Sequence, residues 1–160
     1  MKIIDWDNYF MGVAYLSSLR SKDDRMRVGA CIINEENRII STGYNGMPNG
    51  CEDSTMPWAL GQRLENKHLY VVHAELNAIL SSRADLRGCV LYSSLFPCNE
   101  CAKAIVQSGI AAVVYSEDKH SETDGVKASK IIFDTAGIPY RQMEPSIEII
   151  IKEDEDDSSI

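Results

Sequence analysis

One histidine and two cysteines stand at a spacing that suits a metal ion. Cys98 and Cys101 lie three residues apart in the run PCNEC, so on a helix their sulfur atoms project from the same face. His73 opens a second predicted helix and supplies a third ligand. Three protein ligands leave one position of a tetrahedral Zn²⁺ open, which is typical of a catalytic zinc rather than a structural one.

Glu75 is the candidate catalytic residue. It follows His73 by two positions, where it is poorly placed to ligate the same ion and well placed to move a proton of a metal-bound water. H-x-E followed by P-C-x-x-C is the general signature of zinc-dependent nucleobase deaminases. A C-x-x-C motif alone also occurs in structural zinc sites and redox pairs. The glutamate, the preceding proline and the position of both motifs at the start of helices favour the catalytic reading.

The remaining sequence must fold so that these two helix starts meet. Periodicity and capping residues predict helices from Asp5 to near Ser21, over 73–82, over 98–108, and from Ser121 or Thr123 to Gly137. Strands are predicted at 28–33, 38–42, 90–93, 112–115 and 147–151, with a long irregular stretch over 43–67. A hairpin followed by strand–helix alternation indicates a three-layer α/β/α domain around a central mixed five-stranded sheet.

Composition narrows the function class. The 160 residues include 16 Lys and Arg against 24 Asp and Glu, a net charge of −8, which argues against a general binder of nucleic acid polymers or anionic membranes. Residues 152–160 (KEDEDDSSI) are predicted to be an acidic, solvated tail after a catalytic domain of residues 1–151. No signal-like or membrane-spanning run is found, so a cytoplasmic protein with five reduced or metal-bound cysteines is expected.

Four stretches resemble a known family. Residues 28–32 (VGACI), 43–51 (GYNGMPNGC), 73–78 (HAELNA) and 95–102 (LFPCNECA) are similar to the cytidine/deoxycytidylate deaminase superfamily, and within it to the deoxycytidylate (dCMP) deaminases. The resemblance implies hydrolysis of dCMP to dUMP and ammonia, which supplies thymidylate synthesis. It implies that His73, Cys98 and Cys101 hold zinc, and that Glu75 carries a proton from water to ring nitrogen 3 and then to the departing amine. A phage and a cellular source both remain open, so the cytoplasm in question could be that of a host.

The same resemblance assigns further residues. It places Asn45 on the sugar hydroxyl and the backbone amide of Ala74 on the base carbonyl. It also implies a homohexamer that is activated by dCTP with Mg²⁺ and inhibited by dTTP, at a subunit-interface site that includes Asn45, Gly46, Asn49 and Gly50. A tight turn that needs Gly and Asn for positive φ explains the same four residues equally simply.

The 5′-phosphate of such a substrate needs a cationic partner. The candidates are Lys22, Lys119 and His120, although relatives often read Lys-Tyr where this chain has Lys119-His120. Three rival functions remain: a tRNA adenosine deaminase, which would need a basic groove; a deaminase of free cytidine; and an inert zinc-stabilised nucleotide sensor. Glu75 argues against the inert sensor, because a structural zinc has no use for a carboxylate beside an open position.

Overall fold

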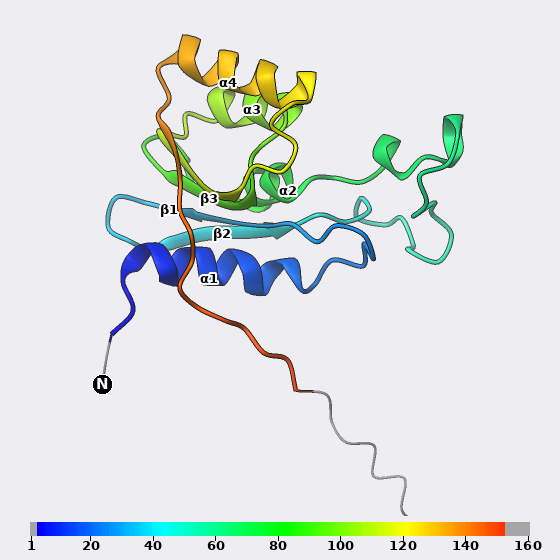
Figure 1. Cartoon of the computed structure of the whole chain (residues 1–160), viewed down its shortest axis with the longest axis horizontal. Coiled ribbons are helices and arrows are strands. Elements are labelled where there is room, and N and C mark those ends of the chain that lie inside the picture. The colour runs from blue at the N-terminus through cyan, green and yellow to red at the C-terminus, as the bar shows by residue number, and fades with distance from the viewer. Residues whose placement is uncertain (1–2, 153–160) are drawn as a thin grey trace, which may run out of the picture.

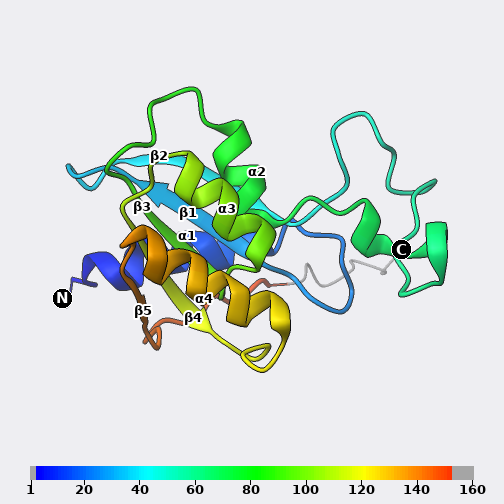
Figure 2. The same ribbon diagram turned by 90° about the horizontal axis from the view of Figure 1, so that it is seen from above.

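The computed structural model describes residues 3–152, which form five strands, four α-helices and two short 3₁₀ helices. In chain order these are α1 (Trp6–Ser18), β1 (Gly29–Ile33), β2 (Ile39–Tyr44), η1 (Arg63–Glu65), η2 (Lys67–Leu69), α2 (Ala74–Ser81), β3 (Val90–Leu95), α3 (Asn99–Gln107), β4 (Ala112–Glu117), α4 (Asp124–Ala136) and β5 (Tyr140–Gln142). Figure 1 shows them from the side, and Figure 2 from above.

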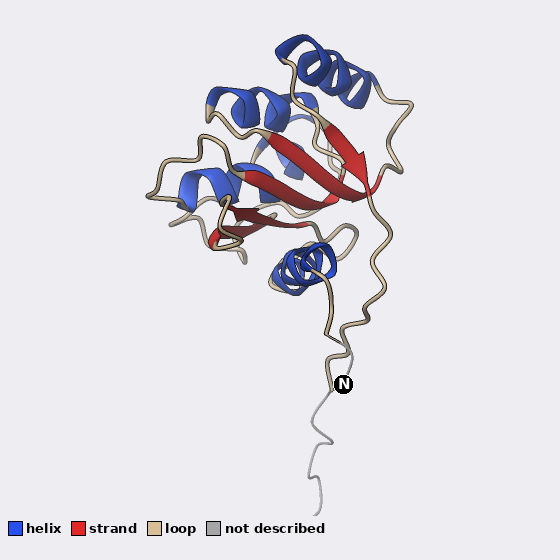
Figure 3. Cartoon of the chain, turned by 90° about the vertical axis from the view of Figure 1, so that its left-hand side faces the viewer, coloured by secondary structure: helices blue, strands red, loops and turns tan. Residues whose placement is uncertain are grey.

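The sheet is mixed and five-stranded, with strand order β2-β1-β3-β4-β5. β1 pairs antiparallel with β2 and β3, while β3, β4 and β5 run parallel. Helix α1 covers one face, and α2, α3 and α4 cover the other (Figure 3). Each face has its own apolar core: Phe10 and Met11 of α1 pack on one side, and Ile105 and Phe133 pack on the other. The predicted three-layer fold is therefore confirmed.

One predicted strand is wrong. The fifth strand is the short segment Tyr140–Gln142 and not residues 147–151, which have no regular structure. The turn after α4 brings the chain back beside β4, so the first residues after Pro139 pair with it. The later apolar run crosses α1 instead. Ile147 packs directly on Gly12 of this helix, since a Cβ on Gly12 would lie only 2.5 Å from Ile147 Cδ1. Ile147 thus packs on α1, whereas Ile150 and Ile151 are exposed.

The first turn of α2 is held tightly against the sheet. A Cβ on Gly43 of β2 would lie 2.2 Å from the Ala74 carbonyl oxygen and 2.5 Å from the Ala78 nitrogen. Only glycine allows this approach of helix and strand backbones. This close packing fixes how near the first turn of α2, which carries Glu75, lies to the sheet.

A long arm leaves the sheet between β2 and α2. Its base is closed by a pair of backbone hydrogen bonds between Gly46 and Val72, with N···O distances of 3.1 and 2.8 Å. Residues 47–71, called the arm below, contain η1 and η2 and project away from the sheet (Figures 1 and 2). The predicted irregular stretch 43–67 thus overlaps the last two residues of β2 and contains η1, while η2 begins at its last residue.

Asp7 joins α1 to β3 and β5. Its carboxylate accepts hydrogen bonds from Arg141 Nη2 at 2.7 and 2.8 Å and from the Tyr92 hydroxyl at 2.7 Å. The Arg141 guanidinium, helped by the Tyr92 hydroxyl and opposed by desolvation, holds the pKa of Asp7 below its usual 3.8. The pKa of Asp7 is lower in the folded than in the unfolded state. Ionised Asp7 therefore stabilises the fold above the unfolded-state pKa, and this stabilisation is lost as the pH falls through the folded-state pKa.

Asp7→Asn is expected to lower the free energy of unfolding by at most about 1 kcal/mol near neutral pH, since the carboxylate is partly exposed. The difference from wild type should be constant above about pH 5 and should shrink below about pH 4. Urea denaturation at a series of pH values measures it, with the exposed Asp24→Asn as the matched control. A difference that stays constant down to about pH 2 would contradict the assignment.

The ends of the chain add little to this picture. No helix within residues 3–152 is long and apolar enough to cross a membrane. The predicted acidic tail falls outside the described residues except for Lys152, which is exposed. The division of the chain at residue 151 stays a prediction.

Candidate active site

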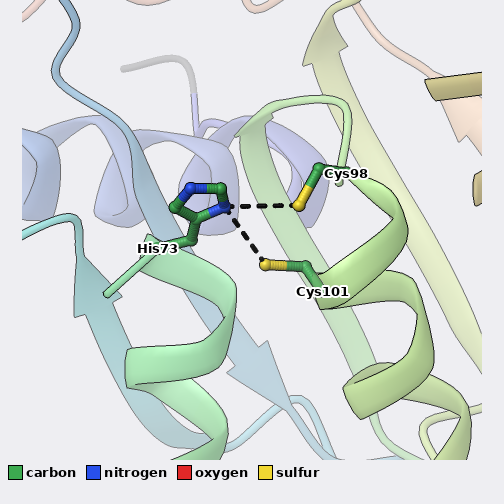
Figure 4. A group of neighbouring side chains, drawn as sticks. All are labelled: His73, Cys98 and Cys101. Carbon is green, nitrogen blue, oxygen red and sulfur yellow. Dashed lines mark hydrogen bonds between the residues drawn. The ribbon is translucent and has the colours of Figure 1, made fainter. Parts of the chain in front are cut away.

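The three predicted metal ligands meet at the N-terminal ends of two neighbouring helices. His73 is the N-cap of α2, Cys98 is the N-cap of α3, and Cys101 follows one turn later. Figure 4 shows the imidazole turned toward both sulfur atoms. His73 Nδ1 lies 3.3 Å from Cys98 Sγ and 3.6 Å from Cys101 Sγ, and all three ligand atoms lie within 4.8 Å of one another.

These separations fit zinc. With Zn–N near 2.0 Å and Zn–S near 2.3 Å, tetrahedral angles place a nitrogen and a sulfur ligand about 3.5 Å apart. Of the three donors, Cys98 has the protonation state that a metal needs. Hydrogen bonds from Cys101 and then His73 lower the pKa of Cys98 to about 3, against desolvation, so Cys98 is a thiolate. The hydrogen bond to Cys98 raises the pKa of His73 to about 9, and the hydrogen bond to Cys98 together with burial raises the pKa of Cys101, so each of these two ligands would release a proton when it binds a metal.

Glu75 lies in the first turn of α2 with its side chain pointing into the same site. It is only 4% exposed, and its Oε2 is 3.6 Å from Cys101 Sγ, which donates to it. Desolvation raises the pKa of Glu75, although the neighbouring His73 opposes this. A buried carboxyl with a raised pKa, beside a metal site, is suited to take up a proton and release it again.

A cavity of about 430 Å³ opens in front of these residues. His73, Ala74, Glu75 and Cys98 form part of its lining, which is largely apolar. The apolar wall residues are Met26, Val28, Leu60, Val71, Leu95, Phe96 and Val126. A flat, weakly polar ring such as a nucleobase fits a slot of this composition, with a few polar groups to orient it.

The other sequence-predicted residues divide into two groups. Asn45, Ala74 and His120 line the cavity. Lys22, Lys119, Gly46, Asn49 and Gly50 do not. The Lys22 ammonium pairs with Asp53 of the arm, and the Lys119 ammonium pairs with Glu117 at 2.7 Å. The structure therefore places two of the three predicted phosphate partners on neighbouring carboxylates instead.

Sequence reasoning missed three charged residues that line the cavity. Arg25 is exposed at its wall, and Asp23 and Lys67 form a buried ion pair there. The sequence offered a signal for Arg25, because this cation lies three residues before the VGACI stretch that resembles the family. Nothing in the sequence marks Asp23 and Lys67 as partners, since they are 44 residues apart.

Known proteins resemble this chain in both sequence and fold. The family model described as the cytidine and deoxycytidylate deaminase zinc-binding region matches residues 4–117, which contain all four site residues. The chain belongs to this family. A deoxycytidylate deaminase of Homo sapiens is 48% identical over 151 residues, 92% of this chain and 85% of the human protein. A probable deoxycytidylate deaminase of Drosophila melanogaster is 47% identical over 150 residues, 89% of this chain and 74% of that protein.

A solved structure of the family agrees with the sheet and helix arrangement. The dCMP deaminase of cyanophage S-TIM5, crystallised in complex with dCMP and dUMP, superposes with a TM-score of 0.70. It is 26% identical, and the match covers 89% of this chain and all of that one. In both sequence and fold the chain is thus a member of a zinc-binding deaminase family.

The remaining cysteines stand apart from the site. Cys31 is buried in β1, Cys89 is buried just before β3, and Cys51 is exposed on the arm. Burial raises the pKa of the Cys31 thiol to about 12, as expected of a core residue. Within residues 3–152, His73, Cys98 and Cys101 form the one cluster of three such ligands that could hold an ion.

Proposed function

We propose that this chain hydrolyses dCMP to dUMP and ammonia. One observation carries the proposal: a buried Glu75 sits beside a His-Cys-Cys ligand set that borders a largely apolar cavity of about 430 Å³. The high identity to deoxycytidylate deaminases over most of the chain supports dCMP over adenosine in tRNA. The shortage of basic groups supports the same choice.

The chemistry requires a base that later acts as an acid. When bound by His73, Cys98 and Cys101, Zn²⁺ supplies a Lewis acid that lowers the pKa of a coordinated water. Glu75 accepts a proton from the attacking water and donates it to ring nitrogen 3 as the bond from oxygen to carbon 4 forms. It then takes the second water proton and gives it to the amine, so the bond from carbon 4 to nitrogen breaks and ammonia leaves.

Backbone and amide groups orient the base and sugar. The N–H of Ala74 belongs to the first turn of α2, where an N–H has no intrahelical acceptor, and it can donate to the base carbonyl. The Asn45 side chain accepts from Val28 N at 2.8 Å and donates to Met26 O at 2.9 Å. Its second N–H is left for a sugar hydroxyl, since an amide carries two donors.

The phosphate is bound at the mouth of the cavity by Arg25 with His120. These two cationic or ionisable groups line the cavity, whereas Lys22 and Lys119 are engaged elsewhere. A guanidinium binds phosphate through parallel charge-assisted hydrogen bonds.

Arg25→Gln is expected to raise the KM for dCMP about tenfold to a hundredfold with little change in kcat, because a phosphate contact is made equally in ground and transition states. Steady-state kinetics with dCMP measure both constants. Arg27→Gln is the matched control, since Arg27 is exposed two residues away and lies outside the cavity lining. An unchanged KM in the Arg25 variant would remove Arg25 from the phosphate site.

Regulation and assembly follow the family resemblance in this proposal. The enzyme is a homohexamer of the cytoplasm that supplies dUMP for thymidylate synthesis. It is activated by dCTP with Mg²⁺ and inhibited by dTTP at a site that includes Asn45, Gly46, Asn49 and Gly50. Of these four residues Gly50 alone has a positive φ, +85°, so the need for a tight turn accounts for Gly50 but not for the other three. The five free thiols support a reducing compartment.

Ammonia release from dCMP, deoxycytidine and CMP tests the proposal on zinc-loaded protein, with and without dCTP plus Mg²⁺ or dTTP. Turnover of dCMP alone, with opposite responses to the two triphosphates, is the expected result. Equal turnover of deoxycytidine would make the chain a nucleoside deaminase without a phosphate requirement. No turnover of any of the three would favour the inert sensor.

A further inference from the structure

The wall of the cavity that carries Arg25 is an irregular segment, residues 22–28, between α1 and β1. Its backbone is held by side chains rather than by a strand or helix. Asp23 Oδ1 accepts from Arg25 N at 2.9 Å and from Met26 N at 3.1 Å. The Asn45 amide described above holds Met26 and Val28 of this wall. The direction of the Arg25 backbone therefore depends on where the Asp23 carboxylate lies.

The second oxygen of Asp23 is held by the arm. Lys67 of η2 donates its ammonium to Asp23 Oδ2, and both side chains are only 5% exposed. Desolvation raises the pKa of Asp23, but the Lys67 ammonium and the two backbone N–H groups lower it by more. The net pKa is below the usual value, so the Asp23 carboxylate is ionised. A buried pair of this kind costs desolvation and becomes strongly destabilising when one partner is removed.

Lys67 occupies the point where the arm turns toward the metal site. Its N–H donates to Ala59 O at 3.0 Å, and its carbonyl accepts from Tyr70 N and Val71 N at 2.9 Å. Leu60 and His68, on either side of this point, line the cavity mouth. The Asp23–Lys67 ion pair thus connects the part of the cavity lining that belongs to the arm with the part that contains Arg25.

A second ion pair offers a natural comparison. Lys22, next to Asp23, pairs with Asp53 on the outgoing half of the arm. The Lys22 side chain is 66% exposed and the Asp53 side chain 34%, and neither residue lines the cavity. Exposed pairs of this kind contribute little to stability. The same wall and the same arm are therefore joined by one buried contact and one exposed contact.

We infer that Asp23 and Lys67 are positioning residues for substrate phosphate: their buried contact holds the arm against the Arg25 wall and so sets the geometry of the cavity mouth. The inference rests on the proposed function, and it assigns neither residue a contact with substrate. Lys67 is the partner of Asp23 and not a phosphate ligand itself, although it is a cation at the cavity.

The variants Asp23→Asn and Lys67→Met are expected to raise the KM for dCMP by about tenfold each, with kcat within about threefold of wild type and zinc content unchanged. Asp23→Asn keeps the oxygen that accepts from Arg25 N and Met26 N. Asp53→Asn is the matched control and should leave both constants within about twofold. If either single variant fails to fold, the double variant leaves no uncompensated charge and is expected to fold.

The double variant is also the decisive measurement. Because both single changes remove the same contact, the double variant should raise KM about as much as either one, not by their product. A direct phosphate contact by Lys67 would give a different pattern, in which Lys67→Met raises KM and Asp23→Asn leaves it unchanged or lowers it. That pattern, or equal losses confined to kcat, would overturn the inference.

A readout without substrate separates this inference from the proposed function. Arg63 is exposed on the arm, so limited trypsin digestion after Arg63 reports opening of the arm. Cleavage should be about tenfold faster in Asp23→Asn than in wild type and unchanged in Asp53→Asn. Unchanged cleavage in Asp23→Asn would overturn the positioning role even if dCMP is the substrate. Faster cleavage in a protein that does not turn over dCMP would leave the contact in place and reject the proposed substrate.

Discussion

Glu75→Gln is expected to bind stoichiometric zinc, fold normally and lose about a thousandfold or more of its turnover of dCMP. Glutamine is nearly isosteric and keeps an oxygen near Cys101, so the packing at the start of α2 is preserved. It cannot accept the proton of water or return one to the amine. The loss should fall on kcat, since the carboxylate's role is realised in the transition state.

Elemental analysis and steady-state kinetics on the same preparation measure zinc and kcat together. Glu100→Gln is the matched control, because Glu100 lies between the two cysteines but is exposed and paired with Lys103 at 2.8 Å. It should retain activity within about twofold. If Glu75→Gln keeps more than about a tenth of the activity, Glu75 is not the general acid and base.

Cys98→Ala is expected to lose both stoichiometric zinc and at least about a thousandfold of activity. The variant removes the thiolate, and the two remaining ligands, His73 and Cys101, cannot fix a metal ion with one open tetrahedral position. The thermal midpoint should lose its response to added zinc, because binding no longer favours the folded state.

Cys51→Ser is the matched control for this change. Cys51 is exposed on the arm, away from the cluster of three ligands. Zinc content and turnover should both stay at the wild-type level. Retention of stoichiometric zinc by Cys98→Ala would overturn the ligand assignment, and loss of zinc from Cys51→Ser would indicate a second metal site.

The helices and the central strands were predictable because their signals are local. Asp5 caps α1 by accepting from Asn8 N at 2.8 Å, and Thr123 caps α4 by accepting from Val126 N at 3.3 Å. Gly137 ends α4 with φ of +71°. Each of these signals acts within a few residues, so the sequence around it is sufficient.

The last strand was not predictable in the same way. Residues 140–142 are too few to show an alternating pattern, whereas residues 147–151 form an apolar run of strand-like composition. The choice between them depends on β4, which offers its free edge at the place where the chain returns from α4. The apolar run instead meets α1 at Gly12, more than a hundred residues earlier.

For the site, the sequence by itself determined the chemistry. His73, Glu75, Cys98 and Cys101 are fixed relative to one another within each helix start, because spacings of two or three residues place side chains on known faces of a helix. Only the tertiary structure decided which charges face the cavity. Lys22 and Lys119 pair with nearby carboxylates, while Arg25 and the Asp23–Lys67 pair reach the cavity through contacts between distant segments. Such contacts depend on how the arm closes over the wall, and no local pattern in the chain encodes that closure.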